Sequence, residues 1–93
     1  MSGGPHVERD VTIVNRAGMH ARPAAEFVKT AGQFSAEITV EKDGLSVNGK
    51  SIMGVLMLAA EQGSLLRLAA TGIDASDAID ALADLVDRGF EEA

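Results

Sequence analysis

A histidine, an arginine and a proline stand close together near the start of a predicted helix, and these residue types suit chemistry on an anion. Downstream of His20, apolar residues recur at three- and four-residue spacing as far as Gly32, which predicts a helix beginning at about Ala21. Pro23 fits the first turn because a proline there loses no intrahelical hydrogen bond. His20 is therefore predicted to be the N-cap residue.

The start of such a helix can bind an anion. We expect the backbone N–H groups of Ala21, Arg22 and Ala24 to be unpaired there, with the positive end of the helix dipole behind them. The Arg22 guanidinium adds donors that suit a phosphate or a carboxylate. The dipole disfavours the imidazolium form of His20 by ~0.3–1 kcal/mol, so we expect a neutral, nucleophilic ring. A phosphoryl group accepted by that ring would be held by the same dipole and by Arg22.

A simpler interpretation makes His20 a turn residue and Arg22 a solvated charge, and for a lone histidine that interpretation would be favoured. The motif around them favours a site instead. Residues 15–24, NRAGMHARPA, resemble the active-site segment of the histidine-containing phosphocarrier protein (HPr) family of the phosphoenolpyruvate-dependent sugar phosphotransferase system. Residues 47–54, VNGKSIMG, resemble the regulatory-serine segment of the same family. The resemblance covers roughly residues 7–90.

The resemblance implies a carrier with a phosphohistidine intermediate rather than a free-standing enzyme. Enzyme I would pass a phosphoryl group to His20, in the family to the ring Nδ1, and His20 would pass it to a IIA unit of a sugar permease. Arg22 would stabilise the transferred oxygens, and Ala21 and Ala24 would bind phosphate through their backbone N–H groups. No cofactor and no metal is expected. No carboxylate or serine is paired with His20 by local spacing, so hydrolysis of a neutral substrate is not expected.

Ser51 would be the site of regulatory phosphorylation by an HPr kinase/phosphorylase, and the phosphoserine form would bind a transcription regulator. The same serine fits as the N-cap of a short helix. The helix is apolar on two faces, with Val55, Leu58 and Ala59 on one and Ile52, Met53 and Leu56 on the other. From the residues alone, a second buried face and an exposed docking patch are equally supported. The resemblance favours Ile52, Met53 and Leu56 as the patch that contacts partners.

Composition excludes other classes of function. Eight basic and fourteen acidic residues give a net charge of −6, and the aromatics are three phenylalanines, so we expect no nucleic-acid partner. Because cysteine is absent, disulfides and thiolate metal sites are excluded. His6 has no neighbouring ligand pattern. The chain shows neither a signal segment nor an apolar run near membrane-spanning length, so we expect a cytoplasmic protein without membrane contact. We also expect a monomer.

The remaining pattern predicts a loose tail over residues 1–6 and one HPr-like domain over residues 7–93. Alternation of apolar and polar residues predicts strands at 7–14, 36–41, 45–47 and 65–70, with Arg9 as an exception on the apolar side and Asp43-Gly44 as a hairpin turn. The order is β-α-β-β-α-β-α. It implies an α+β fold, an open-faced sandwich in which three helices cover one face of a four-stranded antiparallel sheet.

The last helix is predicted to begin after Asp74, with Asp77 completing a capping box. Its predicted buried face comprises Ala78, Ile79, Leu82, Leu85 and Val86. Its predicted solvated face comprises Asp77, Asp80, Asp84 and Asp87.

Other functions fit part of this pattern. The element order alone also suits a ferredoxin-like ligand-binding domain, but the two motifs favour the HPr family. Within the family, a regulator of the nitrogen-related phosphotransferase branch is an alternative. A binding module that reports through Ser51 and passes no phosphoryl group onward is another, although the presence of both His20 and Arg22 weighs against it.

Overall fold

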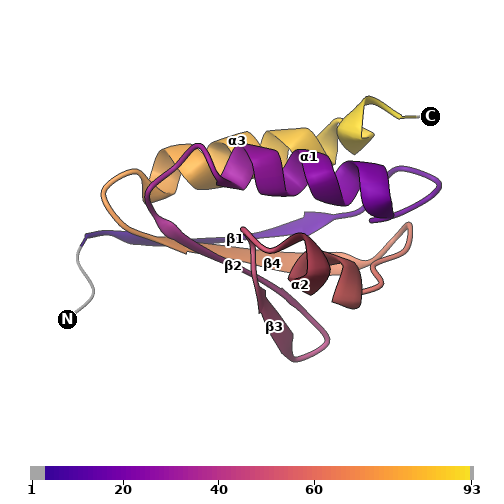
Figure 1. Cartoon of the computed structure of the whole chain (residues 1–93), viewed down its shortest axis with the longest axis horizontal. Helices are drawn as coiled ribbons and strands as arrows, with labels where there is room; N and C mark the ends of the chain where they lie inside the picture. The colour runs from indigo at the N-terminus through magenta and orange to yellow at the C-terminus, as the bar shows by residue number, and fades with distance from the viewer. Residues whose placement is uncertain (1–3, 93) are drawn as a thin grey trace.

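The computed structural model describes residues 4–92 and confirms the predicted order of elements (Figure 1). The elements are β1 (His6–Thr12), α1 (Ala21–Ala31), β2 (Glu37–Lys42), β3 (Leu45–Asn48), α2 (Ile52–Met57), β4 (Leu65–Thr71), α3 (Ala75–Asp87) and a short 3-10 turn, η1 (Gly89–Glu91). Of the predicted tail, residues 1–3 lie outside the described residues. Strand β1 begins at His6, one residue earlier than predicted, and ends at Thr12.

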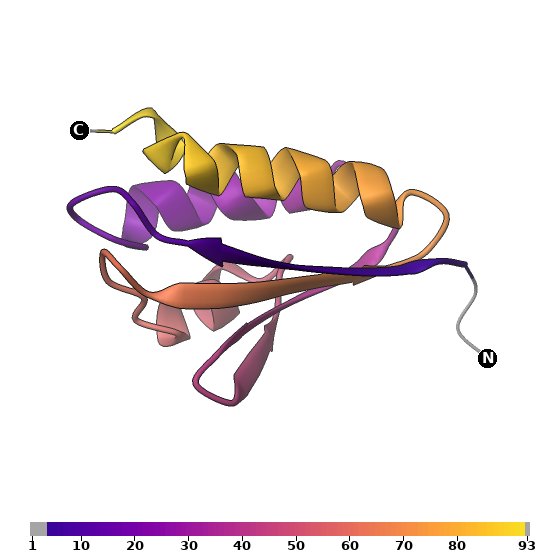
Figure 2. The ribbon, with the colours of Figure 1, turned by 180° about the vertical axis from the view of Figure 1, so that it is seen from behind.

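The four strands form one antiparallel sheet in the order β1-β4-β2-β3 (Figure 2). Strand β4 pairs with both β1 and β2, and the alternation seen in the sequence turns Leu66 and Leu68 into the core. The β2–β3 hairpin turns at Asp43 (φ 51°) and Gly44 (φ 85°), both in the left-handed region. An Asp-Gly pair suits such a two-residue turn, so this prediction is confirmed.

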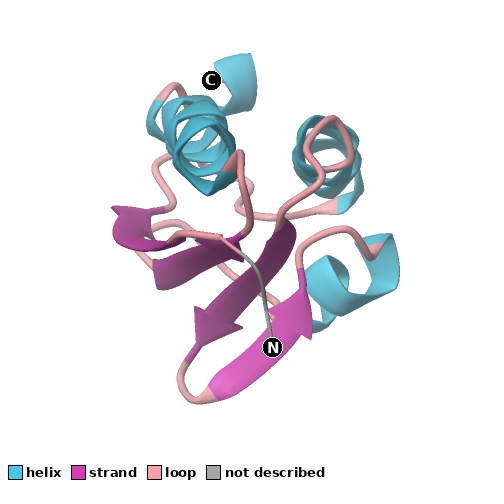
Figure 3. Ribbon diagram, turned by 90° about the vertical axis from the view of Figure 1, so that its left-hand side faces the viewer, coloured by secondary structure: helices cyan, strands magenta, loops and turns pink. Residues whose placement is uncertain are grey.

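Two long helices, α1 and α3, lie on one face of the sheet, and α2 extends the helical layer beside α1 and against β3 (Figure 3). Phe27 of α1, Val55 of α2 and Leu82 of α3 are fully buried between the helices and the sheet. The predicted buried face of α3 is confirmed: Ala78, Ile79, Leu82, Leu85 and Val86 are all buried. The fold is therefore the predicted open-faced sandwich.

The predicted capping box at the start of α3 is wrong. Asp74 is the N-cap residue, but its carboxylate makes no capping hydrogen bond. It instead accepts hydrogen bonds from the N–H groups of Ser35 (2.9 Å) and Ala36 (2.8 Å) and from the Ser35 hydroxyl (3.2 Å). These bonds, the Ser35 N–H bond foremost, hold the pKa of Asp74 below its ordinary value. Asp74 thus joins the start of α3 to the α1–β2 connection.

Helix α2 is shorter than predicted. The sequence pattern placed Ala59 on a helical face, whereas the helix ends at Met57 with Leu58 as its C-cap. Ala59 follows in the left-handed region (φ 49°) and is exposed. The buried face of this segment therefore comprises Val55 and Leu58 without Ala59, because the chain leaves helical geometry before that residue.

Arg9, the exception in the first strand, reaches across to α3. Its guanidinium donates to the Asp80 carboxylate at 2.8 Å. Both side chains are about half exposed, so we expect this ion pair to contribute little to stability. The acids of the predicted solvated stripe, Asp77, Asp80, Asp84 and Asp87, are exposed as predicted.

Candidate functional site

The loop between β1 and α1 is fixed by hydrogen bonds before it reaches His20. The Met19 N–H donates to the Ala60 carbonyl at 2.8 Å, and the Asn15 side-chain amide donates to the Gly18 carbonyl at 2.8 Å. Gly18 has φ 72°, and a Cβ there would lie 2.6 Å from the Ala60 oxygen, so only glycine fits. These contacts hold the start of α1 against the segment that follows α2.

His20 is the N-cap of α1, as predicted, with an extended backbone and no side-chain capping bond. The exposed N–H groups of Ala21 and Arg22 have no acceptor within residues 4–92. Pro23 has no N–H to offer. The Ala24 N–H donates to the His20 carbonyl at 3.0 Å, so the prediction of an unpaired donor at Ala24 is wrong. The N-cap carbonyl takes this N–H as the first helical hydrogen bond, which leaves two free donors.

A carboxylate from the far end of the chain contacts the ring of His20. The ring Nε2 lies 3.1 Å from both Oε1 and Oε2 of Glu92, although the two residues are 72 positions apart. The His20 side chain is 42% exposed, whereas that of Glu92 is only 13% exposed. The other ring nitrogen, Nδ1, has no hydrogen-bond partner in the part of the chain that the structure describes.

Asn15 holds Glu92 in this position. Its amide, which already donates to Gly18, also donates to Glu92 Oε1 at 3.1 Å, and the Asn15 side chain is buried. The hydrogen bond from His20 is the main cause that keeps the pKa of Glu92 below its ordinary value, and Asn15 and the charge of Arg22 act in the same direction. The carboxylate of Glu92 is therefore ionised at neutral pH.

The chain reaches this position through a turn of unusual backbone geometry. Gly89, Phe90 and Glu91 follow one another in the left-handed region, with φ of 62°, 55° and 58°. For residues other than glycine this conformation costs about 1–2 kcal/mol each. Phe90 is 5% exposed, and burial of its ring offsets that cost. The turn brings the end of the chain over the start of α1, as Figures 1 and 2 show from opposite sides.

Arg22 supplies a positive charge at the same end of the molecule. Its side chain is exposed and forms no ion pair among residues 4–92. It is near enough to Glu92 for its charge to lower the pKa of that carboxyl. The free guanidinium and the two free N–H groups of α1 together provide donors for an anion bound beside His20.

Ser51 is the N-cap of α2, which confirms that prediction: its hydroxyl accepts a hydrogen bond from the Gly54 N–H at 3.1 Å. Ile52 is 40% exposed and Met53 is 67% exposed. Leu56 is only partly exposed and packs against the core, so it contributes less surface than predicted. It lies one residue after the buried Val55, at the border of the helix's two faces. The sequence analysis missed Met57, which is 66% exposed.

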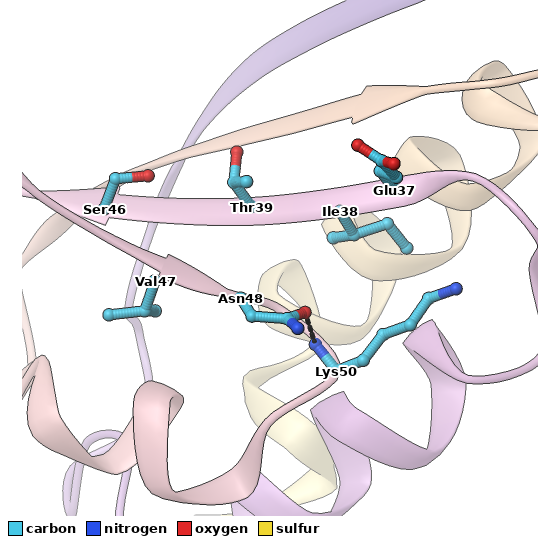
Figure 4. Close-up of a pocket in the computed structure, with 7 residues that line it drawn as sticks. All are labelled: Glu37, Ile38, Thr39, Ser46, Val47, Asn48 and Lys50. Carbon is cyan, nitrogen blue, oxygen red and sulfur yellow. Dashed lines mark hydrogen bonds between the residues drawn. The ribbon is translucent and has the colours of Figure 1, made fainter. Parts of the chain in front are cut away.

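A pocket of about 470 Å³ lies elsewhere, between β2, β3 and Lys50 (Figure 4). The Lys50 ammonium donates to the Phe34 carbonyl at 2.6 Å, and its backbone N–H donates to the Asn48 side chain at 2.8 Å. The cation in this pocket is thus already engaged. His20 does not line the pocket and lies on an open surface instead.

Residues 4–92 contain no group of three or more His, Cys, Asp or Glu side chains placed to hold a metal ion. No helix in that range has the length and apolar character needed to cross a membrane.

Sequence reasoning missed Glu92 as part of the site. Local spacing can pair His20 only with nearby residues, and a carboxylate 72 positions away carries no such signal. The turn that delivers it offers only one weak signal, Gly89 directly after the last helical pattern. The tertiary fold supplies the carboxylate that local spacing did not.

Comparison with known proteins gives consistent similarities. The family model described as "PTS HPr component phosphorylation site" matches residues 7–88. Phosphocarrier protein HPr of Neisseria meningitidis serogroup A is 43% identical over 86 residues, covering 92% of this chain and 97% of that protein. HPr-like protein Crh of Halalkalibacterium halodurans is 44% identical over 82 residues, covering 88% of this chain and 98% of that protein. The crystal structure of HPr from Thermoanaerobacter tengcongensis has 49% identity and a TM-score of 0.90, covering 94% of this chain and 98% of that one.

Proposed function

This chain belongs to the HPr family, and we propose that it accepts a phosphoryl group on His20 from enzyme I and passes it to IIA units of sugar permeases. The observation that carries the proposal is the environment of the His20 ring. Nε2 is occupied by a carboxylate, while Nδ1 has no hydrogen-bond partner among residues 4–92 and belongs to the N-cap residue of a helix whose first two N–H groups are free. We therefore assign the phosphoryl group to Nδ1.

Phosphoryl transfer demands little covalent chemistry from the protein. In a loose, in-line transition state, negative charge spreads over three oxygens of the transferred group, and catalysis comes from positioning and charge stabilisation. The N–H groups of Ala21 and Arg22, the dipole of α1 and the Arg22 guanidinium supply that stabilisation. Because His20 is 42% exposed on an open surface, a donor and an acceptor protein can each reach it in turn.

We assign docking to the exposed apolar surface of α2, which comprises Ile52, Met53 and Met57 with the partly exposed Leu56. This surface and His20 lie on neighbouring segments, because the Met19–Ala60 hydrogen bond joins the start of α1 to the end of the α2 segment. We propose a monomer in solution, because a carrier of this kind must present the surface to successive partners.

We assign regulation to Ser51, with an HPr kinase/phosphorylase as the modifying partner and a transcription regulator as a reader of the phosphoserine. A phosphate there adds about −1.5 to −2 charges directly beside Ile52 and Met53. The partner protein docks on this apolar surface and also carries an anionic phosphoryl group, so the added negative charge repels it.

Two regulatory functions are alternatives to the carrier. The similarity to an HPr-like protein named Crh favours testing a module that receives signals without passing the phosphoryl group onward. A regulator of the nitrogen-related branch is the other. Transfer from the phosphorylated chain to a sugar-permease IIA unit distinguishes the carrier from both.

The direct test is incubation of the purified chain with phosphoenolpyruvate and enzyme I. We expect a mass increase of one phosphoryl group that is lost in acid, and we expect none in His20→Ala. An acid-labile phosphate on His20→Ala would contradict the proposal. Circular dichroism of the variant checks that its fold is intact.

A further inference from the structure

We propose that Met53 and Met57 form a reversible oxidation site on the docking surface, where a peroxide converts both thioethers to sulfoxides and so weakens the binding of partner proteins. This inference rests on the proposed function, because it makes that docking surface sensitive to oxidants. It concerns two side chains that take no part in the chemistry at His20.

Methionine supplies all the sulfur in this chain. Cysteine is absent, and the four methionines are Met1, Met19, Met53 and Met57. In most proteins a cysteine thiolate is the first sulfur that a peroxide attacks. Because this chain has no thiol, a peroxide reacts first with whichever methionine thioethers it can reach. Met1 lies outside the described residues, and the other three differ in their surroundings.

The three described methionines differ in exposure. Met53 is 67% exposed and Met57 is 66% exposed, whereas Met19 is 4% exposed and belongs to the core. Met53 and Met57 are four positions apart in α2, so their side chains lie on the same face of that helix. Figure 3 shows α2 at the outer edge of the helical layer. A peroxide in solution can therefore reach both thioethers of the docking surface, while the fold protects Met19.

The oxidation is the transfer of one oxygen atom. A lone pair on the methionine sulfur attacks one oxygen of hydrogen peroxide, the O–O bond breaks, and the second oxygen leaves as water with both protons. The sulfur is oxidised by two electrons and the peroxide is reduced by two. Methionine sulfoxide reductases, one for each epimer, reverse the step. The electrons then come from a dithiol that becomes a disulfide, and the sulfoxide oxygen leaves as water.

A sulfoxide makes the docking surface polar without adding charge. Its oxygen accepts hydrogen bonds from water, and an apolar partner surface that covers it removes those bonds without replacing them. This differs from a phosphate on Ser51, two positions before Met53, which repels a partner through its charge. Salt screens the effect of a charge on an exposed surface, but it does not remove the cost of burying a neutral polar group.

The first measurement follows the oxidation of each methionine in the purified chain by hydrogen peroxide, using peptide mapping by mass spectrometry. We expect Met53 and Met57 each to gain one oxygen atom about tenfold faster than Met19, because access to the sulfur controls the reaction. Oxidation of Met19 at the same rate as Met53 and Met57 would overturn the assignment of the site.

The second measurement is the rate of transfer from phosphorylated enzyme I before and after oxidation. The oxidised chain should show an apparent KM about tenfold higher, with a maximal rate within about twofold of the untreated rate. The melting temperature should not change. The rise in KM should persist at high salt, and treatment with both reductases and dithiothreitol should remove it. Phosphoramidate, a small donor that needs no docking surface, should phosphorylate His20 equally in both forms.

The control is the double variant Met53→Leu/Met57→Leu, which keeps two apolar side chains on α2 but carries no thioether there. Its KM should be the same before and after treatment with peroxide. Met53→Gln introduces a neutral polar group without any oxidant, so it should raise KM more than Met53→Leu does. A rise in KM of the oxidised double variant equal to that of oxidised wild type would place the sensitive group elsewhere and overturn the inference.

An unchanged KM in wild type that carries both sulfoxides would overturn the inference and leave the proposed function intact. A loss of transfer together with a fall in melting temperature would also overturn it, because damage to the fold would then explain the loss. If untreated wild type accepts no phosphoryl group from enzyme I, the proposed function is wrong, and the control of docking by oxidation is rejected with it.

Discussion

The two ends of α3 each bring a carboxylate to a distant part of the chain, but the partners differ in kind. Asp74, before the helix, accepts three hydrogen bonds from Ser35 and Ala36, two of them from backbone N–H groups that never change protonation. Glu92, after the helix, accepts from the ring of His20, whose proton can sit on either nitrogen. A carboxylate bound to backbone can only hold the fold together, whereas one bound to a histidine can also set its chemistry.

This contrast predicts that changes at one end alter stability and changes at the other alter transfer. The largest effect on transfer, apart from loss of His20, is expected from Arg22→Ala. Because this side chain is exposed, we expect the rate from enzyme I to fall about 10- to 100-fold, with little change in the melting temperature. Arg22→Lys should recover only part of the rate because an ammonium lacks the planar pair of donors.

Transfer kinetics and thermal melts of the two arginine variants check this. Unchanged rates in both would show that the backbone donors and the partner proteins stabilise the phosphoryl oxygens without Arg22. Loss of the native circular dichroism spectrum would show instead that Arg22 is required for the fold.

Asp74→Asn should affect stability rather than transfer. We expect it to lower the melting temperature by several degrees and to leave the transfer rate within about twofold of the wild-type rate. The effect has a defined pH dependence. Since the folded-state pKa of Asp74 is below its ordinary value, the stabilisation is fully present above the unfolded pKa of about 3.9 and is lost as the pH falls through the lower folded value. The gap in melting temperature between wild type and Asp74→Asn should therefore be constant from pH 5 to 7 and shrink below about pH 3.9.

Thermal melts of both proteins across that pH range make the measurement. A gap that grew on acidification would mean that the charge of Asp74 destabilises the fold. Slow transfer by a well-folded Asp74→Asn variant would contradict the claim that Asp74 affects only stability.

Much of this architecture was predictable because its signals are local. The alternation over residues 65–70, the Asp43-Gly44 turn and the serine before Ile52 are all local signals. Each prediction is confirmed, and β4 extends one residue further than predicted, to Thr71. His20 was placed correctly at the N-cap for the same reason.

The errors have a common physical origin in contacts that local spacing does not encode. Asp74 was predicted to cap its own helix, but N–H groups 38 and 39 positions away compete for its carboxylate. Glu92 was missed because its partner is 72 positions away. Ala59 and Phe90 adopt left-handed geometry without being glycine, so composition gave no sign of either turn. The prediction of an unpaired N–H at Ala24 failed for a different reason, because it did not count the carbonyl of the N-cap residue His20 as the acceptor.

Ser51→Asp tests whether the functional region extends from His20 to the start of α2. One added charge should slow transfer from enzyme I roughly fivefold at low ionic strength, which corresponds to about 1 kcal/mol of repulsion. The effect should weaken at high salt because exposed charges are screened. Rates for wild type, Ser51→Ala and Ser51→Asp at two salt concentrations provide the comparison, and wild-type behaviour of Ser51→Asp at low salt would contradict the proposed electrostatic switch.

The smallest effect is expected from truncation of the docking surface. Met53→Ala should raise the apparent KM for enzyme I about threefold and hardly change the melting temperature, because this side chain is 67% exposed. Leu56, on the same helix, packs against the core, so Leu56→Ala should lower the melting temperature more than it raises KM. Equal losses of melting temperature in the two variants would show that Met53 belongs to the core and not to the docking surface.

The central claim is that His20 carries the phosphoryl group on Nδ1 while Nε2 stays protonated against Glu92. Phosphorus and nitrogen NMR of the chain phosphorylated by enzyme I tests both halves in one sample. We predict a single phosphohistidine with the N–P bond at Nδ1 and a proton on Nε2. A phosphoryl group found on Nε2 would contradict the account, because Glu92 would then have to leave the ring for the reaction to occur.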